Sequence, residues 1–340
     1  MHIEYLRSSS YSRFDFCPLL YYLEYCLGWT SPSGKKATMG TIVHGVLETI
    51  ATLSKAKKNK QDTINNKIVG KISTNIYNID GITAKVYNYY KKHSTHLTFT
   101  QQDYKDCEKW VHKTLEFNNG QFDPRKQNIV QSELPFDIPL EYDWALLRNG
   151  KYLFLKGTID LVVQESETRY HVQDYKTGAR KNWSTEEVKE HQDLQDDIQV
   201  RLYHYVIAKL YPELTEILVT IYYINDGGPF TICLNLDDDL IKTEQMLKTR
   251  FEEIRDCIRP PQNKTWKCSK LCGCGKTSFE DTEITPTKHN GKYLTKCEQI
   301  WNELQKHPID VVTKHYTKPG FSVDYYQPPG EVQIRKKYYG

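Results

Sequence analysis

Several features that would place this chain of 340 residues in a specialised class are missing from its sequence. No apolar run approaches the roughly 20 residues needed to cross a bilayer, and the first residues lack the basic and then apolar form of a secretion signal. No internal repeat is present, and the phosphate-binding pattern Gly-x-x-x-x-Gly-Lys-[Ser/Thr] of nucleotide-driven motors is absent. We therefore expect a cytoplasmic protein without motor activity, in the host-cell cytoplasm if its source is viral.

The chain also has little net charge. Its formal charge is +3, with 46 basic and 43 acidic residues, so overall electrostatics does not point to nucleic acid. Two local basic runs, residues 55–60 and 335–339, are suited to phosphate contacts, with solvated helix or tail residues as the alternative for each. A hydrophobic content of 39% and a charged content of 26% are ordinary for a globular protein of this size.

The strongest signal lies in two neighbouring apolar segments, residues 157–163 and 172–178. The first contains Asp160 and the second contains Asp174, with Lys176 two residues beyond it. Side chains alternate with a period of two in a strand, so Asp174 and Lys176 are expected on one face of the second segment.

A hairpin between these segments is expected to bring the two acids together. The polar residues 165–168 are typical of a hairpin loop, and symmetry about Glu167 places Asp160 opposite Asp174, with Cβ atoms roughly 5 Å apart. Two carboxylates this close repel each other unless a cation lies between them, and Lys176 completes a site for a phosphate bound to a metal. The pattern favours a metal-dependent phosphodiesterase; the alternative is a surface hairpin with solvated charges.

Three further segments carry polar residues whose positions suggest a role in the same site. His44 lies in residues 39–48, which read as an amphipathic helix, and Glu133 lies in an expected strand before the hairpin. Gln199 and Tyr203 are four residues apart and share one helical face. Each has a structural alternative. His44 would be an ordinary core histidine, Glu133 would be a solvent-facing acid, and Gln199 with Tyr203 would be an ordinary buried polar pair.

The order of these residues resembles the RecB-type branch of the PD-(D/E)XK nuclease superfamily. That branch includes AddB-type helicase-nucleases, CRISPR-adaptation nucleases and many phage exonucleases. The resemblance covers roughly residues 5–275 and is concentrated in short motifs. It implies an α/β, restriction-endonuclease-like core, in which helices flank a central mixed β-sheet, with a helical insertion at about residues 55–125. The matching residues are His44, Glu133, Asp160, Asp174, Lys176, Gln199 and Tyr203.

The resemblance also implies a metal site. Asp160, Asp174 and the main-chain carbonyl of Tyr175 would provide oxygen ligands for Mg²⁺ or Mn²⁺, and His44 would add a nitrogen ligand. Water bound to such an ion has a lowered pKa. The resemblance implies that its in-line attack would expel the 3′ oxygen and leave a 5′ phosphate, the usual outcome in the family.

The other matching residues would act around the metal. Lys176 would position the attacking water or neutralise the phosphate at the transition state. Glu133 would bind a second metal or hold a water molecule, while Gln199 and Tyr203 would orient the lysine and the strand to be cut. These roles are implied by the resemblance alone.

The cysteines suggest a second metal centre. The chain has nine, and an odd number argues against a disulfide framework. Cys17, with Cys268, Cys272 and Cys274, resembles the ligand set of the [4Fe–4S] cluster in iron–sulfur-containing RecB-type nucleases. The spacing of the last three departs from the common pattern. Structural Zn²⁺ on the same thiolates, or cysteines that bind no metal, therefore remain alternatives.

We therefore expect a nuclease domain over residues 1–275, closed by a cysteine-rich loop at residues 266–275, and an extension of unknown role at residues 276–340, shaped as an extended arm. The expected activity is metal-dependent hydrolysis of DNA, exonucleolytic on single strands or duplex ends. Expected partners are DNA and a helicase, recombination or replication protein, and no membrane. The alternatives are a non-catalytic nucleic-acid-binding or adaptor protein and an endonuclease that cuts DNA or RNA.

Periodicity and turn residues also predict elements outside the motifs. Residues 60–120 are expected to be mostly helical. The remaining expected elements are helices at residues 8–28, 194–210 and 238–258 and strands at residues 217–225 and 230–236.

Overall fold

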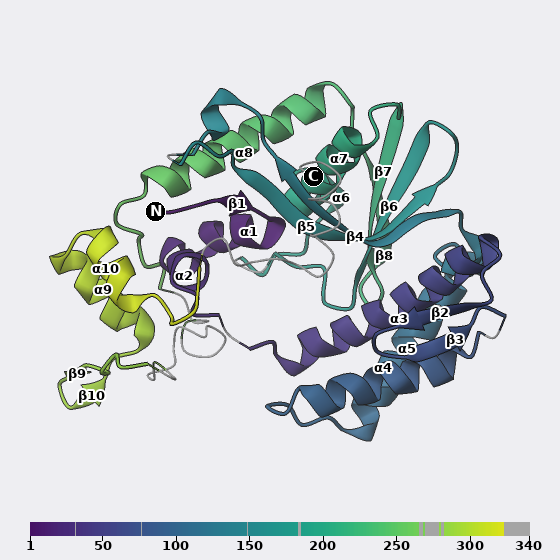
Figure 1. Ribbon diagram of the computed structural model, residues 1–340, viewed down its shortest axis with the longest axis horizontal. Helices are drawn as coiled ribbons and strands as arrows, with labels where there is room; N and C mark the ends of the chain where they lie inside the picture. Colours follow the sequence, from purple (N-terminus) through teal and green to yellow (C-terminus); the bar gives the residue numbers. More distant parts are fainter. Residues whose placement is uncertain are drawn as a thin grey trace. The chain divides into compact units, whose positions relative to one another are not determined.

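The chain forms two compact units, each described here by itself (Figure 1). The computed structural model describes residues 1–30, 32–75, 77–147, 149–182, 185–264, 268, 279 and 282–322. Unit 1 consists of Met1–Pro32, Pro135–Gly157 and Ile241–Gly340, and unit 2 consists of Ser33–Leu134 and Thr158–Leu240. The domain boundary predicted at residue 275 stays a prediction.

A mixed β-sheet has the strand order β1-β5-β6-β7-β8, with β4 paired to β5. Strand β1 is parallel to β5 and β6 is parallel to β7, whereas the β5–β6 and β7–β8 pairs are antiparallel. Because helices flank this mixed sheet, the predicted α/β class is confirmed. The strands are β1 (Tyr5–Leu6), β4 (Ile129–Pro139), β5 (Phe154–Gln164), β6 (Arg169–Lys176), β7 (Glu216–Tyr223) and β8 (Gly228–Cys233).

Unit 2 contains strands β6 to β8 and the helices that carry the candidate site. The parallel β6–β7 pair needs a crossover, which α6 (His191–Gln195) and α7 (Ile198–Leu210) provide. The predicted helix at residues 194–210 is thus divided in two. Helix α7 starts at the N-cap Asp197, whose side chain accepts a hydrogen bond from the backbone N–H of Gln199.

The long helix α3 (Lys35–Lys58) forms the centre of the hydrophobic core of unit 2. Apolar side chains recur on it at intervals of three and four residues, which is the helical period, and the five between residues 42 and 50 are at most 2% exposed. They are Ile42, Val43, Val46, Leu47 and Ile50. The polar residues His44 and Glu48 lie on a neighbouring face, four residues apart.

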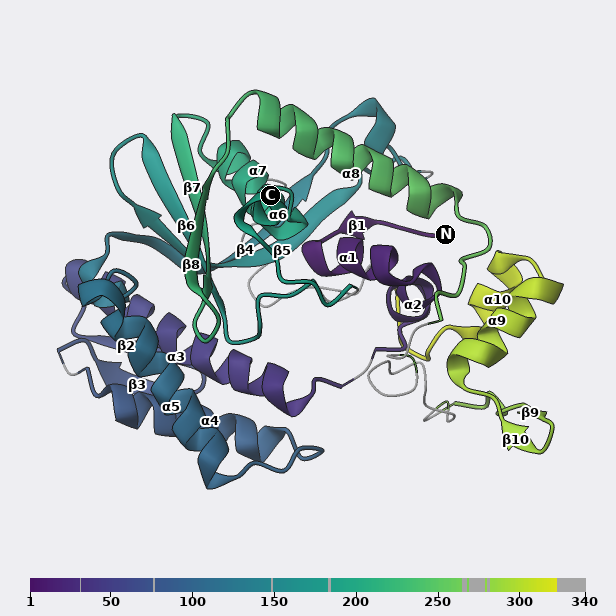
Figure 2. The same cartoon turned by 180° about the vertical axis from the view of Figure 1, so that it is seen from behind.

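The predicted insertion at residues 55–125 is helical only in part. Helices α4 (Ile79–His93) and α5 (Gln101–Glu116) lie side by side along α3 (Figure 2). A capping box between Thr100 and Asp103 starts α5. Before α4 the chain forms an antiparallel hairpin that the sequence did not predict. Its strands are β2 (Thr63–Asn66) and β3 (Gly70–Ser73). After α5, the chain forms short 3-10 turns at Phe117–Asn119 and Pro124–Lys126.

In unit 1, the helix predicted at residues 8–28 is divided into three parts. The ring of Pro18 disfavours helical geometry at the residue before it, so Cys17 is extended at φ −163° and a new helix begins at Pro18. The predicted glycine stop is present: Gly28 has φ +80°, which strains any other residue. The three parts are α1 (Ser8–Phe16), α2 (Pro18–Tyr21) and the π-helical η1 (Tyr22–Cys26). Two further helical elements are a 3-10 turn (Asp143–Ala145) and α8 (Asp238–Asp256), which leads from unit 2 into unit 1.

The described part of the predicted extension packs against the N-terminal segment of the same unit. The indole N–H of Trp29 donates to the carbonyl of Tyr316 at 2.7 Å, and Tyr22 Oη lies 2.8 Å from Thr313 Oγ1. An extended arm is therefore wrong for residues 282–322; the basic run at residues 335–339 lies outside the described residues. The elements here are β9 (Lys288–His289), β10 (Lys292–Tyr293), α9 (Lys296–Lys306) and α10 (Ile309–Tyr316).

Among the described residues, no helix combines the length and the apolar character that a membrane crossing requires.

Candidate active site

The β5–β6 hairpin has the register that the sequence predicted. Leu161 pairs with Gln173 and each following pair keeps symmetry about Glu167, so Asp160 and Asp174 occupy the next positions of the ladder. Both carboxylates are largely withdrawn from solvent, with side chains 12% and 1% exposed.

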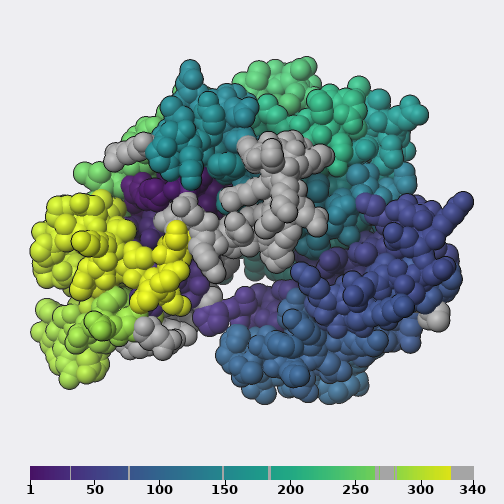
Figure 3. Space-filling view, viewed as in Figure 1, coloured from purple at the N-terminus to yellow at the C-terminus, as the bar shows by residue number. Residues whose placement is uncertain are grey.

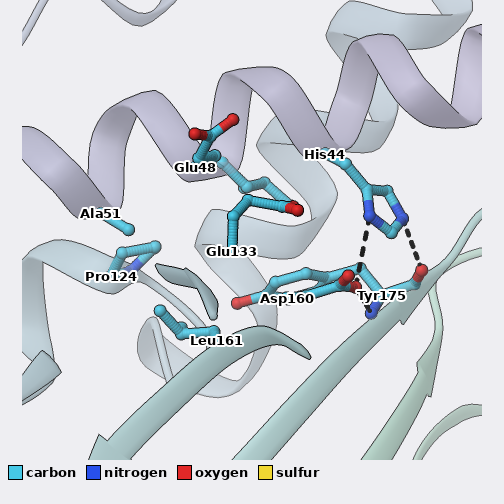
Figure 4. A pocket seen from close by; sticks show the side chains of 9 residues that line it. His44, Glu48, Ala51, Pro124, Glu133, Asp160, Leu161 and Tyr175 are labelled. Carbon is cyan, nitrogen blue, oxygen red and sulfur yellow. Dashed lines mark hydrogen bonds and ion pairs between the residues drawn. The ribbon is translucent and has the colours of Figure 1, made fainter. Parts of the chain in front are cut away.

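His44 reaches the hairpin from α3 and contacts both strands (Figure 4). Its Nδ1 lies 3.2 Å from Oδ2 of Asp160, and its Nε2 lies 2.7 Å from the main-chain oxygen of Tyr175. The backbone N–H of Tyr175 donates to the same oxygen of Asp160 at 3.0 Å. Three of the four predicted metal-binding residues therefore meet at one point.

A close contact between α3 and the loop after β6 permits this approach. A Cβ added at Gly40, one turn before His44, would lie 2.9 Å from Oγ1 of Thr177. Thr177 directly follows Lys176, so the side chain at position 40 sets how near the helix can come to the lysine. Only glycine, which has no Cβ, allows α3 and Thr177 to lie this close without a steric clash.

Asp174, Lys176, Gln199 and Tyr203 form a second, connected part of the site. Lys176 Nζ lies 2.7 Å from Oδ2 of Asp174. On the other side of the carboxylate, Gln199 donates to Oδ1 at 3.0 Å and the Tyr203 hydroxyl lies 3.2 Å from the same atom. Tyr203 Oη is also 3.0 Å from the carbonyl of Thr158, which ties α7 to β5.

Glu133 belongs to β4 but departs from strand geometry. Its φ is +44°, in the left-handed region that non-glycine residues rarely adopt, and such strain persists only where the surrounding structure holds it. The carboxylate faces the pocket shown in Figure 4. This small pocket is lined by the polar residues His44, Glu48, Glu133, Asp160 and Tyr175 and the apolar residues Leu47, Ala51, Pro124 and Leu161.

Glu48 is a site residue that the sequence analysis missed. It lines the same pocket as Glu133, and its charge contributes to the raised pKa of Glu133. The available signal was its spacing: Glu48 follows His44 by four residues, so the two share one helical face.

The carboxyl groups and the histidine shift one another's pKa values. Burial lowers the pKa of His44, but the charge of Asp160 outweighs it and raises the value to about 9. Burial and then the charge of Asp160 raise the pKa of Glu133 to about 8. Burial raises the pKa of Asp174 to about 6, against the opposing charge of Lys176. At neutral pH the site thus holds more carboxyl groups than it can ionise, and this favours the binding of positive charge.

The donor set fits a divalent cation. The ligand atoms of His44, Glu133 and Asp160 lie within 4.8 Å of one another, and carboxylate oxygen with one imidazole nitrogen suits Mg²⁺ or Mn²⁺. Both ring nitrogens of His44 face oxygen atoms. A proton on the ring therefore occupies a place, between nitrogen and oxygen, that a bound cation would take. Asp174, which is held by Lys176 and Gln199, is not one of these three residues.

Two of the four cysteines predicted to hold a cluster, Cys17 and Cys268, lie among the described residues. Cys17 is buried, and burial raises the pKa of its thiol. Cys268 is half-buried, with Sγ 3.7 Å from the carbonyl of Asn263. Cys272 and Cys274 lie outside the described residues, so the cluster stays a prediction.

A family model described as the PD-(D/E)XK nuclease superfamily matches residues 8–276. The chain belongs to this superfamily. The family predicted from the short motifs is thereby confirmed at the level of the superfamily, and so is the restriction-endonuclease-like core. PD-(D/E)XK nucleases use divalent metal ions and act on nucleic acid. Assignment to the RecB-type or iron–sulfur branch stays a prediction.

Two solved structures resemble this PD-(D/E)XK nuclease weakly. A candidate exonuclease from Eubacterium rectale is 12% identical, with a TM-score of 0.46 over 84% of this chain and 91% of the other. The protein SSO0001 is 11% identical, with a TM-score of 0.31 over 80% of this chain and 84% of the other. Both similarities are too low to inform the activity. No curated protein matches the chain.

Proposed function

We propose that this PD-(D/E)XK nuclease is a metal-dependent DNA nuclease that cuts at the site formed by β5, β6, α3 and α7. The observation that carries the proposal is the junction of His44, Asp160 and the Tyr175 carbonyl beside the Asp174–Lys176 pair. A structural role explains it poorly, because a fold gains little from burying several acids that raise one another's pKa values.

The metal would be held by His44, Asp160 and the main-chain oxygen of Tyr175, with Glu133 as a further carboxylate. When bound, a divalent ion supplies Lewis acidity, which lowers the pKa of water and neutralises phosphate charge. Mg²⁺ and Mn²⁺ both suit these ligands.

The remaining residues hold the amine and the acid in place. Asp174 fixes Lys176 at 2.7 Å, and Gln199 and Tyr203 fix Asp174 from the side opposite the lysine. The Lys176 ammonium, with its side chain 33% exposed, is accessible to a phosphate oxygen or to the attacking water. It would stabilise the negative charge that develops on the phosphate as the 3′ oxygen leaves.

We further propose that the enzyme acts as an exonuclease on single strands or duplex ends, leaves 5′ phosphates and works in the cytoplasm. A helicase or another replication or recombination protein would supply any unwinding. These finer assignments rest on the resemblance of the motifs to RecB-type nucleases.

End-labelled linear single strands, closed circular single strands, duplex DNA and RNA, each incubated with Mn²⁺, Mg²⁺ or chelator, test the proposal. We expect metal-dependent loss of linear DNA, and Lys176→Ala should abolish it while Lys151→Ala, which changes an exposed lysine of unit 1, should not. Cutting of closed circles would replace the exonuclease assignment with an endonuclease, and cutting of RNA would replace the assignment of DNA as the substrate. Binding without cutting in every metal would indicate the non-catalytic alternative.

The [4Fe–4S] cluster on Cys17, Cys268, Cys272 and Cys274 is a separate proposal that rests on the resemblance. Anaerobic purification should yield a brown protein that absorbs near 400 nm, and Cys17→Ala should remove the colour. A colourless protein with one equivalent of zinc would favour the structural Zn²⁺ alternative.

A further inference from the structure

The end of helix α4 combines aromatic rings with positive charge. The segment of residues 81–102 contains no Asp or Glu. Its basic residues are Lys85, Lys91, Lys92, His93 and His96, and all five are exposed. Exposed basic side chains on a segment of 22 residues without an acidic residue are complementary to a polyanion.

Three rings at this end of α4 contact one another. The Tyr89 and His93 ring centroids are 4.1 Å apart with an interplanar angle of 32°, and Tyr90 meets Tyr89 edge-on at 5.4 Å. Nδ1 of His93 lies 2.7 Å from the main-chain oxygen of Tyr89, which fixes the ring. Tyr89 is 37% exposed, although it is a large aromatic residue. We call Tyr89, Tyr90 and His93 the α4 platform.

Core packing does not account for Tyr89 and His93, the two exposed members of the α4 platform. Tyr87 has that role on the same helix: it is 4% exposed, its ring meets Phe99 and Tyr104, and its hydroxyl donates to the carbonyl of Thr100. Tyr89, two residues on, points away from that core. Figure 3 shows the side chains of the insertion, in blue, at the surface of unit 2.

The α4 platform belongs to the same unit as the candidate site. Helix α4 packs against α3 beside His44, where a Cβ added at Gly45 would lie 3.3 Å from Val86. One turn after Val86, Tyr90 packs against the core of unit 2. Burial raises the pKa of Tyr90, and Tyr89, Glu48 and Glu133 add to this rise.

We propose that the α4 platform stacks unpaired bases of single-stranded DNA while Lys91 and Lys92 pair with its phosphates, next to the pocket of His44 and Glu133. Every base has a π-face, so stacking holds a strand without selecting its sequence, but it requires bases that are not already stacked in a duplex. This inference rests on the proposed nuclease function and gives single strands as its substrate class.

Binding without cleavage tests the α4 platform. The probe is a fluorescein-labelled oligothymidylate of 20 nucleotides, titrated with full-length protein in EDTA and followed by fluorescence anisotropy. Tyr89→Leu should raise the Kd about tenfold, which is within the range for loss of one stacked base, and Tyr89→Phe should stay within about twofold. Lys91→Gln with Lys92→Gln should reduce the slope of log K against log salt by about 1.4, or about 0.7 per phosphate contact.

Matched variants and a second substrate make the outcome decisive. Tyr293→Leu changes an exposed tyrosine of unit 1, and Lys306→Gln with Lys314→Gln removes the same charge elsewhere; neither should weaken binding. The inference would be overturned if the control variants lost as much affinity for the oligothymidylate as the α4 variants. It would also be overturned if Tyr89→Leu weakened binding to a blunt duplex equally, or if Tyr89→Leu bound the oligothymidylate as the wild type does. Hydrolysis of thymidine 5′-phosphate p-nitrophenyl ester, which carries a single base and no neighbouring nucleotide, reports the proposed function separately and should be unchanged by Tyr89→Leu.

Discussion

The imidazole of His44 and the carboxylate of Asp160 form a partly buried ion pair, with Nδ1 3.2 Å from Oδ2. The other ring nitrogen of His44 lies 2.7 Å from the main-chain oxygen of Tyr175, so both nitrogens are satisfied only when the ring is protonated. A metal ligand must be neutral imidazole. Cation binding at this site is therefore coupled to the release of a proton.

Metal affinity should consequently rise with pH. The pKa of His44 is about 9 and that of Glu133 about 8, so both groups hold their protons at pH 7 and must lose them to bind a cation. We expect the association constant for Mn²⁺ to increase about tenfold per pH unit, up to about pH 8, for each proton released. Titration calorimetry in buffers of different ionisation enthalpy measures the number of protons directly. A proton count of zero at pH 7 would contradict the coupling.

The contact between Gly40 and Thr177 should control activity more than stability. In a helix interior, Gly→Ala normally stabilises by about 1 kcal/mol, but the new Cβ would lie 2.9 Å from Thr177 Oγ1 beside Lys176. Gly40→Ala should therefore lower kcat with little change in Tm, and the double variant with Thr177→Ala should recover most of the loss. Gly34→Ala, with no atom near the added Cβ, is the control. Additive effects of the two substitutions would show that they do not interact.

Glu133 should make the metal-free protein less stable as pH rises. Folding raises its pKa from 4.5 to about 8, so the folded chain binds more protons than the unfolded chain between these values and loses stability across this interval. In EDTA at pH 7.5, Glu133→Gln should be more stable than the wild type by about 4 kcal/mol, and the difference should vanish near pH 4.

Urea denaturation at several pH values measures this effect of Glu133. The substitution keeps a non-glycine residue at φ +44°, so the backbone strain stays the same in both proteins. Glu167→Gln, in the exposed hairpin loop, serves as the control. If wild type and Glu133→Gln showed parallel pH profiles, the carboxyl groups would not be coupled as described.

His204 should give the opposite pH dependence at lower pH. It is fully buried on α7, and burial lowers its pKa from 6.5 to about 4. The unfolded chain therefore binds more protons between these values, and stability falls as pH decreases from 6.5 to 4, by about 3 kcal/mol from this residue. His204→Leu should flatten the curve of unfolding free energy in this interval. A curve of unchanged slope would assign acid sensitivity to other groups.

Much of the site could be predicted because its geometry follows local rules. The symmetric polar loop around Glu167 fixes the hairpin register, and this register places Asp160 and Asp174 directly beyond the last pair, Leu161 and Gln173. The spacing of Gln199 and Tyr203 likewise fixes one helical face. Each of these relationships joins residues that are close in the sequence, so it could be predicted from the local pattern alone.

The unpredicted parts depend on contacts between distant segments. Nothing near Glu133 in the sequence requires a left-handed backbone, which the packing around it imposes. The β2–β3 hairpin was missed because its strands, residues 63–66 and 70–73, carry few apolar side chains and show no clear alternation. Pro18 should have indicated the break after α1, but the apolar residues on both sides suggested one continuous helix.

Anomalous diffraction from a crystal of the full chain soaked in Mn²⁺ tests the central claim most directly. The account predicts a manganese peak about 2.1 Å from a carboxylate oxygen of Asp160, the main-chain oxygen of Tyr175 and a ring nitrogen of His44. Absence of a peak there at saturating Mn²⁺ and pH 8, with His44 still paired to Asp160, would contradict it.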